Sequence, residues 1–158
     1  MAFHQRNETS GDIWLTPPTI LEPLGKFDLD PCAAPHPRPW ETAQSYYVEE
    51  DDGLNQEWFG RVWLNPPYGR NISAWLENMA AHVESGGSGI ALIFARTGTR
   101  AWQDHVFPAV DSILWVRGRI KFCLPDGTVG AAPAGAPSEL VAYTPEDTKV
   151  LAGSGIPG

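Results

Sequence analysis

The stretch Val62-Trp63-Leu64-Asn65-Pro66-Pro67-Tyr68-Gly69 decides how this chain folds. Its first three residues are apolar and typical of a buried strand. That strand must end at the prolines, because proline has no N–H for the hydrogen-bond ladder of a sheet. The chain therefore leaves the sheet at Asn65 and places an amide, backbone carbonyls of fixed direction and an aromatic ring at the strand's carboxyl end. Ligands of open α/β sheets bind at that edge.

These groups suit a planar substrate that carries an amino group, and the run resembles the Asn-Pro-Pro-Tyr motif of amino-group methyltransferases, which use S-adenosylmethionine. Asn65 Oδ1 and the Pro66 carbonyl can each accept one amino hydrogen, and Tyr68 can stack on the ring. Because a heteroaromatic amine has a delocalised lone pair, two acceptors favour a more tetrahedral nitrogen and aim its lone pair at the methyl donor. Such catalysis depends on alignment and preorganised charge rather than on a strong base. We predict that Asn65, Pro66, Pro67 and Tyr68 form the catalytic edge.

The bulk properties indicate one domain. The chain has 158 residues, of which 42% are hydrophobic, enough for a core. Its longest apolar run, Ile90–Ala95, is too short to span a bilayer, and residues 1–12 are polar and predict a flexible tail rather than a signal peptide. Cys32 and Cys123 have no metal-ligand spacing, so we expect no disulfide framework and no metal site. A reduced, cytoplasmic protein without membrane contact is predicted.

The charge distribution is uneven. A net charge of −8 argues against a general nucleic-acid binder. However, five of the eleven Lys and Arg residues fall within one short stretch: Arg96, Arg100, Arg117, Arg119 and Lys121. Arginines pair with phosphates, and Gly118 lets the backbone approach closely. We predict that these cations form a phosphate-facing rim; the alternative is a set of surface cations on a strand edge.

Hydrophobic periodicity and turn residues predict alternating strands and helices, and therefore a three-layer α/β sandwich. A helix is expected after Thr16 and Pro17, with Thr16 as its cap. The clearest helix covers 72–83, and a further helix is expected at 99–106. Strands are expected at 27–29, 46–48, 62–64, 90–95, 113–116 and 139–143. The domain should cover 13–145, with a second flexible tail at 146–158.

Several segments occur in an order that resembles one family. They are Trp14-x-Thr16-Pro17, Leu29-Asp30-Pro31-Cys32-Ala33, Asp52-Gly53-Leu54 before Trp58, Asn65-Pro66-Pro67-Tyr68-Gly69 and Gly118-Arg119-Ile120-Lys121-Phe122. Together they resemble the bacteriophage-type DNA N-6-adenine methyltransferase (Dam) family over roughly residues 12–143, nearly the whole chain. Their joint occurrence is far more specific than any one motif.

The resemblance implies a Rossmann-like methyltransferase sandwich with a mostly parallel sheet and an antiparallel C-terminal strand. It implies S-adenosylmethionine as cofactor, duplex DNA with a flipped adenine as substrate, and a phage or prophage protein in a bacterial cytoplasm. Thr16 and Pro17 would flank the methionine part, and the Asp52 carboxylate would accept from the cofactor's adenine. The cofactor residues implied are Trp14, Thr16, Pro17, Asp30, Pro31, Cys32, Ala33, Asp52 and Asn65.

The chain departs in two features from the cofactor-binding pattern of general methyltransferases. No Gly-x-Gly loop follows the first strand, and no clear acid ends the second strand to hold the ribose, where Glu49 and Glu50 are only candidates. The motif itself also leaves the substrate open. Cytosine N4, an RNA base, a protein glutamine, or a non-catalytic role in binding remain as alternatives to adenine N6.

Overall fold

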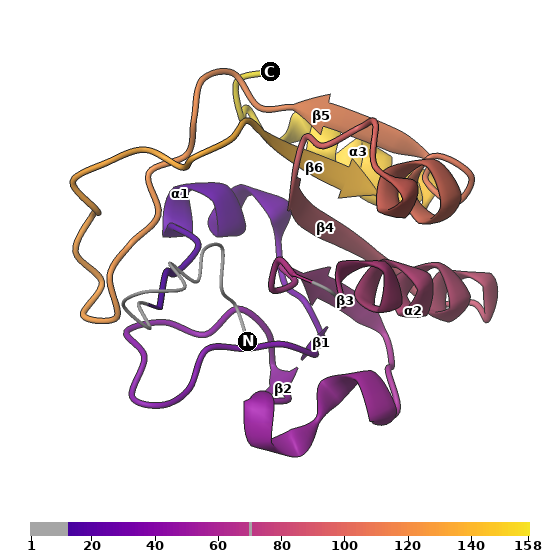
Figure 1. The fold of residues 1–158 in the computed structure, drawn as a ribbon, viewed down its shortest axis with the longest axis horizontal. Helices are drawn as coiled ribbons and strands as arrows, with labels where there is room; N and C mark the ends of the chain where they lie inside the picture. The colour runs from indigo at the N-terminus through magenta and orange to yellow at the C-terminus, as the bar shows by residue number, and fades with distance from the viewer. Residues whose placement is uncertain (1–12, 70) are drawn as a thin grey trace.

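A six-stranded sheet forms the centre of the computed structural model, which describes residues 13–69 and 71–158 (Figure 1). Its strands are β1 (Leu29–Asp30), β2 (Ser45–Tyr46), β3 (Arg61–Leu64), β4 (Ser88–Phe94), β5 (Ser112–Trp115) and β6 (Ser138–Ala142). The strand order is β2-β1-β3-β4-β6-β5. Strands β1 to β4 are parallel, and β6 lies antiparallel between β4 and β5. The prediction of a mostly parallel sheet with an antiparallel last strand is confirmed.

Seven helical segments connect these strands within the described residues. They are α1 (Pro18–Leu21), η1 (Glu22–Leu24), η2 (Glu49–Asp51), η3 (Gly53–Asn55), α2 (Ile72–Glu84), η4 (Trp102–Val106) and α3 (Pro145–Gly153). Helix α2 confirms the predicted apolar stripe, because Trp75, Leu76 and Met79 are all buried. The helix expected at 99–106 is a π-helical segment, η4.

Alternation along the strands divides the core between the two faces of the sheet. Trp63, Ile90 and Leu92 point to one face and pack in one buried cluster with residues of α1, η1 and α3. Neighbours such as Val62 and Ala91 point to the other face, where α2 and η4 contribute to a second cluster. Figure 1 shows α2 in front of the sheet and α3 behind it. Both faces are therefore covered, which explains why β4 is an uninterrupted apolar run.

The parallel arrangement brings the carboxyl ends of several strands to one edge. Asp30 ends β1, Asn65 follows β3 and Arg96 lies just beyond β4. Strand β5 is antiparallel to β6, and therefore runs in the same direction as β4. Its carboxyl end, which leads into Arg117, thus lies at the same edge.

The opposite edge of the sheet is held by a buried ion pair. Arg61 Nε donates to Asp147 Oδ1 at 2.9 Å, and the Asp147 side chain is only 2% exposed. Asp147 Oδ2 also accepts from Gly89 N at 2.8 Å, while Thr144 Oγ1 caps α3 by accepting from Asp147 N. The flexible tail expected at 146–158 does not match this structure. The sequence Thr144-Pro145-Glu146-Asp147 starts a capped helix there. The other expected tail, residues 1–12, lies outside the described residues.

Replacing Asp147 by alanine should lower the free energy of unfolding by about 3 kcal/mol, because the half-buried Arg61 guanidinium would lose its buried counter-charge. Urea unfolding followed by circular dichroism measures this. Glu146→Ala, at an exposed neighbouring position of the same helical turn, is the control and should change the free energy by under about 1 kcal/mol. Equal effects of the two substitutions would contradict the role given to the ion pair.

Candidate active site at the carboxyl edge of the sheet

Asn65 is the central polar residue of this edge. Its side chain is fully buried (0% exposed) at the end of β3. The amide Nδ2 donates a hydrogen bond to Thr16 Oγ1 at 2.9 Å. Asn65 Oδ1 is buried as well but has no hydrogen-bond partner among the described residues. A buried acceptor without a donor costs free energy, which makes Asn65 Oδ1 a candidate for contact with a ligand's N–H group.

Thr16 has a different role from the one expected. Helix α1 begins at Pro18, its N-cap is Pro17, and no side chain caps it. The Thr16 hydroxyl instead accepts from Asn65, and the Thr16 carbonyl accepts from Trp40 Nε1 at 3.1 Å. Because Thr16 takes a hydrogen of the amide NH2 group, Asn65 Oδ1 must point the other way. Thr16 therefore sets the orientation of the acceptor.

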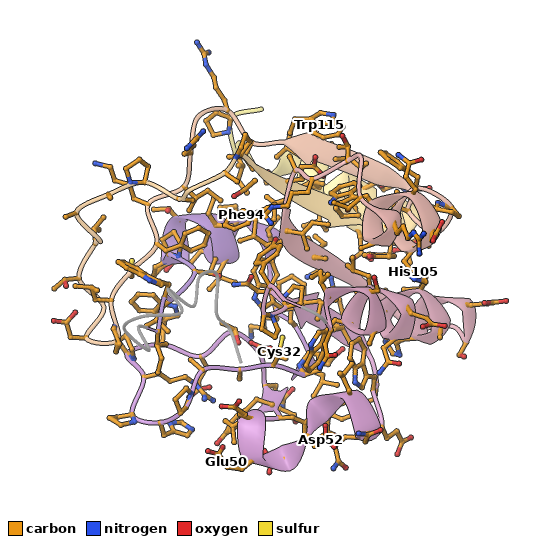
Figure 2. All side chains as sticks on the ribbon, viewed as in Figure 1. Cys32, Glu50, Asp52, Phe94, His105 and Trp115 are labelled. Atoms are coloured by element: carbon orange, nitrogen blue, oxygen red, sulfur yellow. The ribbon has the colours of Figure 1, made fainter. Side chains whose placement is uncertain are left out.

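Cys32 fixes Asn65 from a second direction. Its thiol donates to the Asn65 backbone carbonyl, with 3.3 Å between Sγ and O. Burial raises the pKa of the Cys32 thiol to about 12, so the thiol keeps the proton that this hydrogen bond needs. Figure 2 places Cys32 in the interior of the molecule. The loop after β1 and the loop after β3 are thus joined through one residue.

Asp30 is used within the protein. Its Oδ1 accepts from Cys32 N at 3.0 Å, and its Oδ2 accepts from the Thr42 hydroxyl. Burial raises the pKa of Asp30, and the hydrogen bonds from Thr42 and Cys32 oppose that rise. Pro31 and Ala33 are buried beside it, with Ala33 N donating to the Tyr47 carbonyl at 2.9 Å. The carboxylate therefore shapes the loop rather than facing outward.

The Asp52 loop is packed directly against this segment. A Cβ atom built on Gly53 would lie 1.9 Å from the Pro31 carbonyl oxygen, so only glycine permits the contact. Asp52 itself has a left-handed backbone (φ 54°) and is exposed, with Oδ2 accepting from Asn55 Nδ2 at 2.6 Å. Figure 2 shows Asp52 and Glu50 at the margin of the molecule. The structure therefore packs Gly53, which follows Asp52 directly in the chain, against the Pro31 carbonyl.

Tyr68 packs the loop after β3 onto the end of β4. Its ring stacks on Phe94 with centroids 4.4 Å apart and an interplanar angle of 17°, and its hydroxyl accepts from the Phe94 N–H. Burial raises the pKa of Tyr68, so the phenol stays protonated. The Arg96 guanidinium lies 5.7 Å from the Tyr68 ring centre. Pro66 is buried and Pro67 half-buried between Asn65 and Tyr68.

The other predicted cations are exposed and more spread out. Arg117, Arg119 and Lys121 follow β5, and Arg119 Nη1 reaches the Ala134 carbonyl at 3.4 Å. Arg100 is exposed just before η4. The structure therefore places Arg96 next to Tyr68 and the cations after β5 farther along the same edge.

Trp14 and Pro17 pack near this second group of cations. Trp14 is half-buried against the segment after β5, where a Cβ on Gly130 would lie 2.5 Å from its ring. Pro17 is buried. Within the described residues, no helix is long and apolar enough to cross a membrane, and no group of His, Cys, Asp or Glu side chains is placed to hold a metal ion.

Sequence reasoning missed Glu139. This residue of β6 is fully buried (0% exposed), and neither carboxyl oxygen has a hydrogen-bond partner among the described residues. It is paired with Ile93 on one side and with Trp115 on the other. Burial raises the pKa of Glu139 from about 4.5 to about 8. Its only sequence signal was an acid within an otherwise apolar strand, and the burial follows from the position of β6 between β4 and β5.

The fold and the site together define an α/β protein that presents a preorganised amide acceptor at the carboxyl edge of a mostly parallel sheet, where such proteins bind ligands. The family model described as "DNA N-6-adenine-methyltransferase (Dam)" matches residues 4–147. The chain belongs to this family, and the resemblance inferred from its motifs is confirmed.

One curated relative is the DNA N-6-adenine-methyltransferase of Escherichia phage T1. It is 27% identical over 115 residues, which cover 66% of this chain and 44% of the relative. The chain thus matches less than half the length of that protein. No solved structure shows a significant match.

Glu139 should make the protein less stable as the pH rises from about 4.5 to about 8. Over that range the unfolded carboxyl is ionised while the folded one keeps its proton, so each pH unit costs up to about 1.4 kcal/mol. Urea unfolding at several pH values should show this decline in the wild type and a flatter profile in Glu139→Gln. Glu146→Gln, at an exposed position, should retain the wild-type slope. An unchanged slope in Glu139→Gln would contradict the buried, protonated carboxyl.

Proposed function

We propose that this chain is an S-adenosylmethionine-dependent DNA methyltransferase that acts on adenine N6, and that its fold is a Rossmann-like methyltransferase sandwich. Family membership supports the reaction class. The observation that carries the proposal is the Asn65 side chain, buried and anchored through Nδ2 while Oδ1 has no partner among the described residues. An exocyclic amine is the group that satisfies such an acceptor.

Asn65 and Pro66 align the amine. Asn65 Oδ1 accepts one amino hydrogen and the Pro66 carbonyl accepts the other, which directs the nitrogen lone pair away from both oxygens. The Thr16 and Cys32 hydrogen bonds hold Asn65 before the substrate arrives, so little reorganisation is needed at the moment of reaction. Pro67 limits the motion of the loop. The reaction then depends on alignment, and no residue of the edge has to act as a strong base.

The residues around Asn65 fit the proposed cofactor in two respects. Asp52 offers an exposed carboxylate that can accept from an adenine amino group, and Gly53 holds that carboxylate beside the Pro31 loop. Thr16 contacts Asn65 directly, through the hydrogen bond from Asn65 Nδ2 at 2.9 Å, and the methionine part is proposed to bind beside Thr16 and Pro17. S-adenosylmethionine would supply an electrophilic methyl group bound to a sulfonium sulfur.

The proposed substrate is an adenine flipped out of duplex DNA in a bacterial cytoplasm. Leaving the stack costs a few kcal/mol, and stacking on an aromatic side chain returns about 1–3 kcal/mol. Tyr68, supported by Phe94, is that aromatic group. Arg96 lies beside it and can meet a phosphate, with Arg100, Arg117, Arg119 and Lys121 farther along the rim.

Asn65→Ala should lower methyl transfer to DNA at least a hundredfold, because it removes the acceptor that aligns the amine. Cofactor affinity, measured by calorimetry, should change by only a few-fold. The assay incubates labelled S-adenosylmethionine with adenine-containing DNA and identifies the methylated nucleoside by mass analysis. Asn71→Ala is the matched control, since Asn71 is exposed and its side chain caps nothing. Near-normal transfer by Asn65→Ala would refute the mechanism, and N4-methylcytosine as product would refute the choice of base.

Thr16→Val should also impair transfer, because it removes the acceptor that orients the Asn65 amide. We expect a tenfold to roughly hundredfold fall in kcat, the scale of a misaligned catalytic group. Thr16→Ser keeps the hydroxyl and should stay within a few-fold of the wild type. If serine and valine behave alike, the hydrogen bond from Asn65 Nδ2 to Thr16 does not set the acceptor's direction.

A further inference from the structure

A mostly apolar hollow lies at the same edge, beside the catalytic loop. It has a volume of about 470 Å³, within the size range of small-ligand sites. Pro17, Pro18 and Trp40 line one side, and Val129 and Ile156 line another. Val129 is 63% exposed, although it is a large hydrophobic residue. The hollow therefore offers an apolar surface that the described part of the chain leaves open to solvent.

Three cations line the same hollow. Arg117, Arg119 and Lys121 are all exposed, and all contribute to its wall. An apolar floor beside a cationic rim suits a ligand that is both apolar and anionic. A nucleotide matches that description, because its phosphate is charged while its sugar and base present apolar faces.

The hollow adjoins the residues that hold Asn65. Pro17 follows Thr16 directly, and Thr16 Oγ1 accepts from Asn65 Nδ2 at 2.9 Å. Trp40, which lines the hollow, donates from Nε1 to the Thr16 carbonyl at 3.1 Å. A polymer whose target base reaches Asn65 would therefore place an adjoining nucleotide at the hollow.

A tethered hairpin forms the outer wall. Cys123 and Leu15 exchange two backbone hydrogen bonds, of 2.7 and 2.8 Å, and Leu124 N donates to Thr128 O at 2.8 Å. The hairpin lies within the orange loops that extend past α1 in Figure 1. Since the backbone bonds fix the hairpin, Val129 is held in place rather than left on a free loop.

We propose that this hollow binds the nucleotide next to the target adenine, with its phosphate on the Arg117–Lys121 rim and its sugar and base against the apolar floor. This inference rests on the proposed function, because it takes DNA as the substrate. It assigns Val129 a contact with DNA and gives the hollow the role of holding the nucleotide beside the target adenine.

Val129→Asp tests the proposal by placing a negative charge on the apolar lining of the hollow. Binding of a fluorescent DNA duplex to the full chain, measured by anisotropy, should weaken roughly tenfold or more, because the carboxylate repels the phosphate and is desolvated. Val129→Ser, the neutral control, should weaken binding less. Both variants should keep the wild-type melting temperature and cofactor affinity. Wild-type DNA affinity in Val129→Asp would overturn the proposal.

The cationic rim gives a second, independent measurement. Lys121→Gln and Arg117→Gln should each reduce the slope of log Kd against log salt concentration by about 0.9, the value for one lost phosphate contact. Lys149→Gln, at an exposed position of α3, is the control and should leave the slope unchanged. Equal slopes in all three variants would overturn the phosphate contact even if a Val129 variant failed to fold.

Failure of this inference is distinct from failure of the proposed function. If the wild type methylates adenine in DNA while the Val129 and rim variants bind DNA normally, only the hollow is refuted. If the wild type methylates no DNA adenine, the proposed function fails on the nucleoside analysis alone.

Discussion

The hydrogen bonds around Asn65 are the constraint on which the site depends. The prolines that follow force β3 to end there, and burial then requires the amide to find partners inside the protein. Thr16 takes a hydrogen of Nδ2, and Cys32 donates to the backbone carbonyl. Three segments far apart in sequence are thereby joined at one residue. The same bonds fix Nδ2 and the backbone carbonyl and leave Oδ1 without a partner among the described residues, so stability and the proposed alignment of the substrate come from one arrangement.

Strand β3 connects two edges of the sheet: the Arg61–Asp147 ion pair lies at its amino end, and Asn65 lies at its carboxyl end. At its amino end Arg61 is paired with Asp147, and its Nη1 donates a hydrogen bond to the Leu24 carbonyl at 2.7 Å. At its carboxyl end the edge keeps an acceptor without a partner in Asn65 Oδ1, and nearby β6 buries the Glu139 carboxyl. Burying such groups costs free energy that the rest of the fold must supply. The ion pair between Arg61 and Asp147 at one end of the sheet helps to offset the cost of burying these groups at the other.

Local signals predicted much of this structure. The spacing of apolar residues predicts helix α2, and the prolines after Asn65 predict where β3 ends. Both signals depend on interactions between residues that are close in sequence. The Thr-Pro pattern shows where such reasoning fails. Sequence patterns predict a capped helix at Thr16 and a flexible tail from residue 146, yet Thr144 caps a helix and Thr16 does not, because the Thr16 hydroxyl lies within reach of Asn65. Glu139 was missed for the same reason: its burial depends on which strands flank β6, and the sequence does not state that order.

Strand order also resolves the conflict between an acidic chain and a proposed DNA substrate. The acids of η2 follow β2 at one end of the sheet, whereas the Arg117–Lys121 rim follows β5 at the other end. Five strand spacings of about 4.8 Å separate the two by roughly 24 Å. In Figure 2, Glu50 lies at the bottom of the view and Trp115 at the top. Because charges in physiological salt are screened beyond about 8 Å, a phosphate at the rim is governed by the cations beside it and not by the net charge of −8.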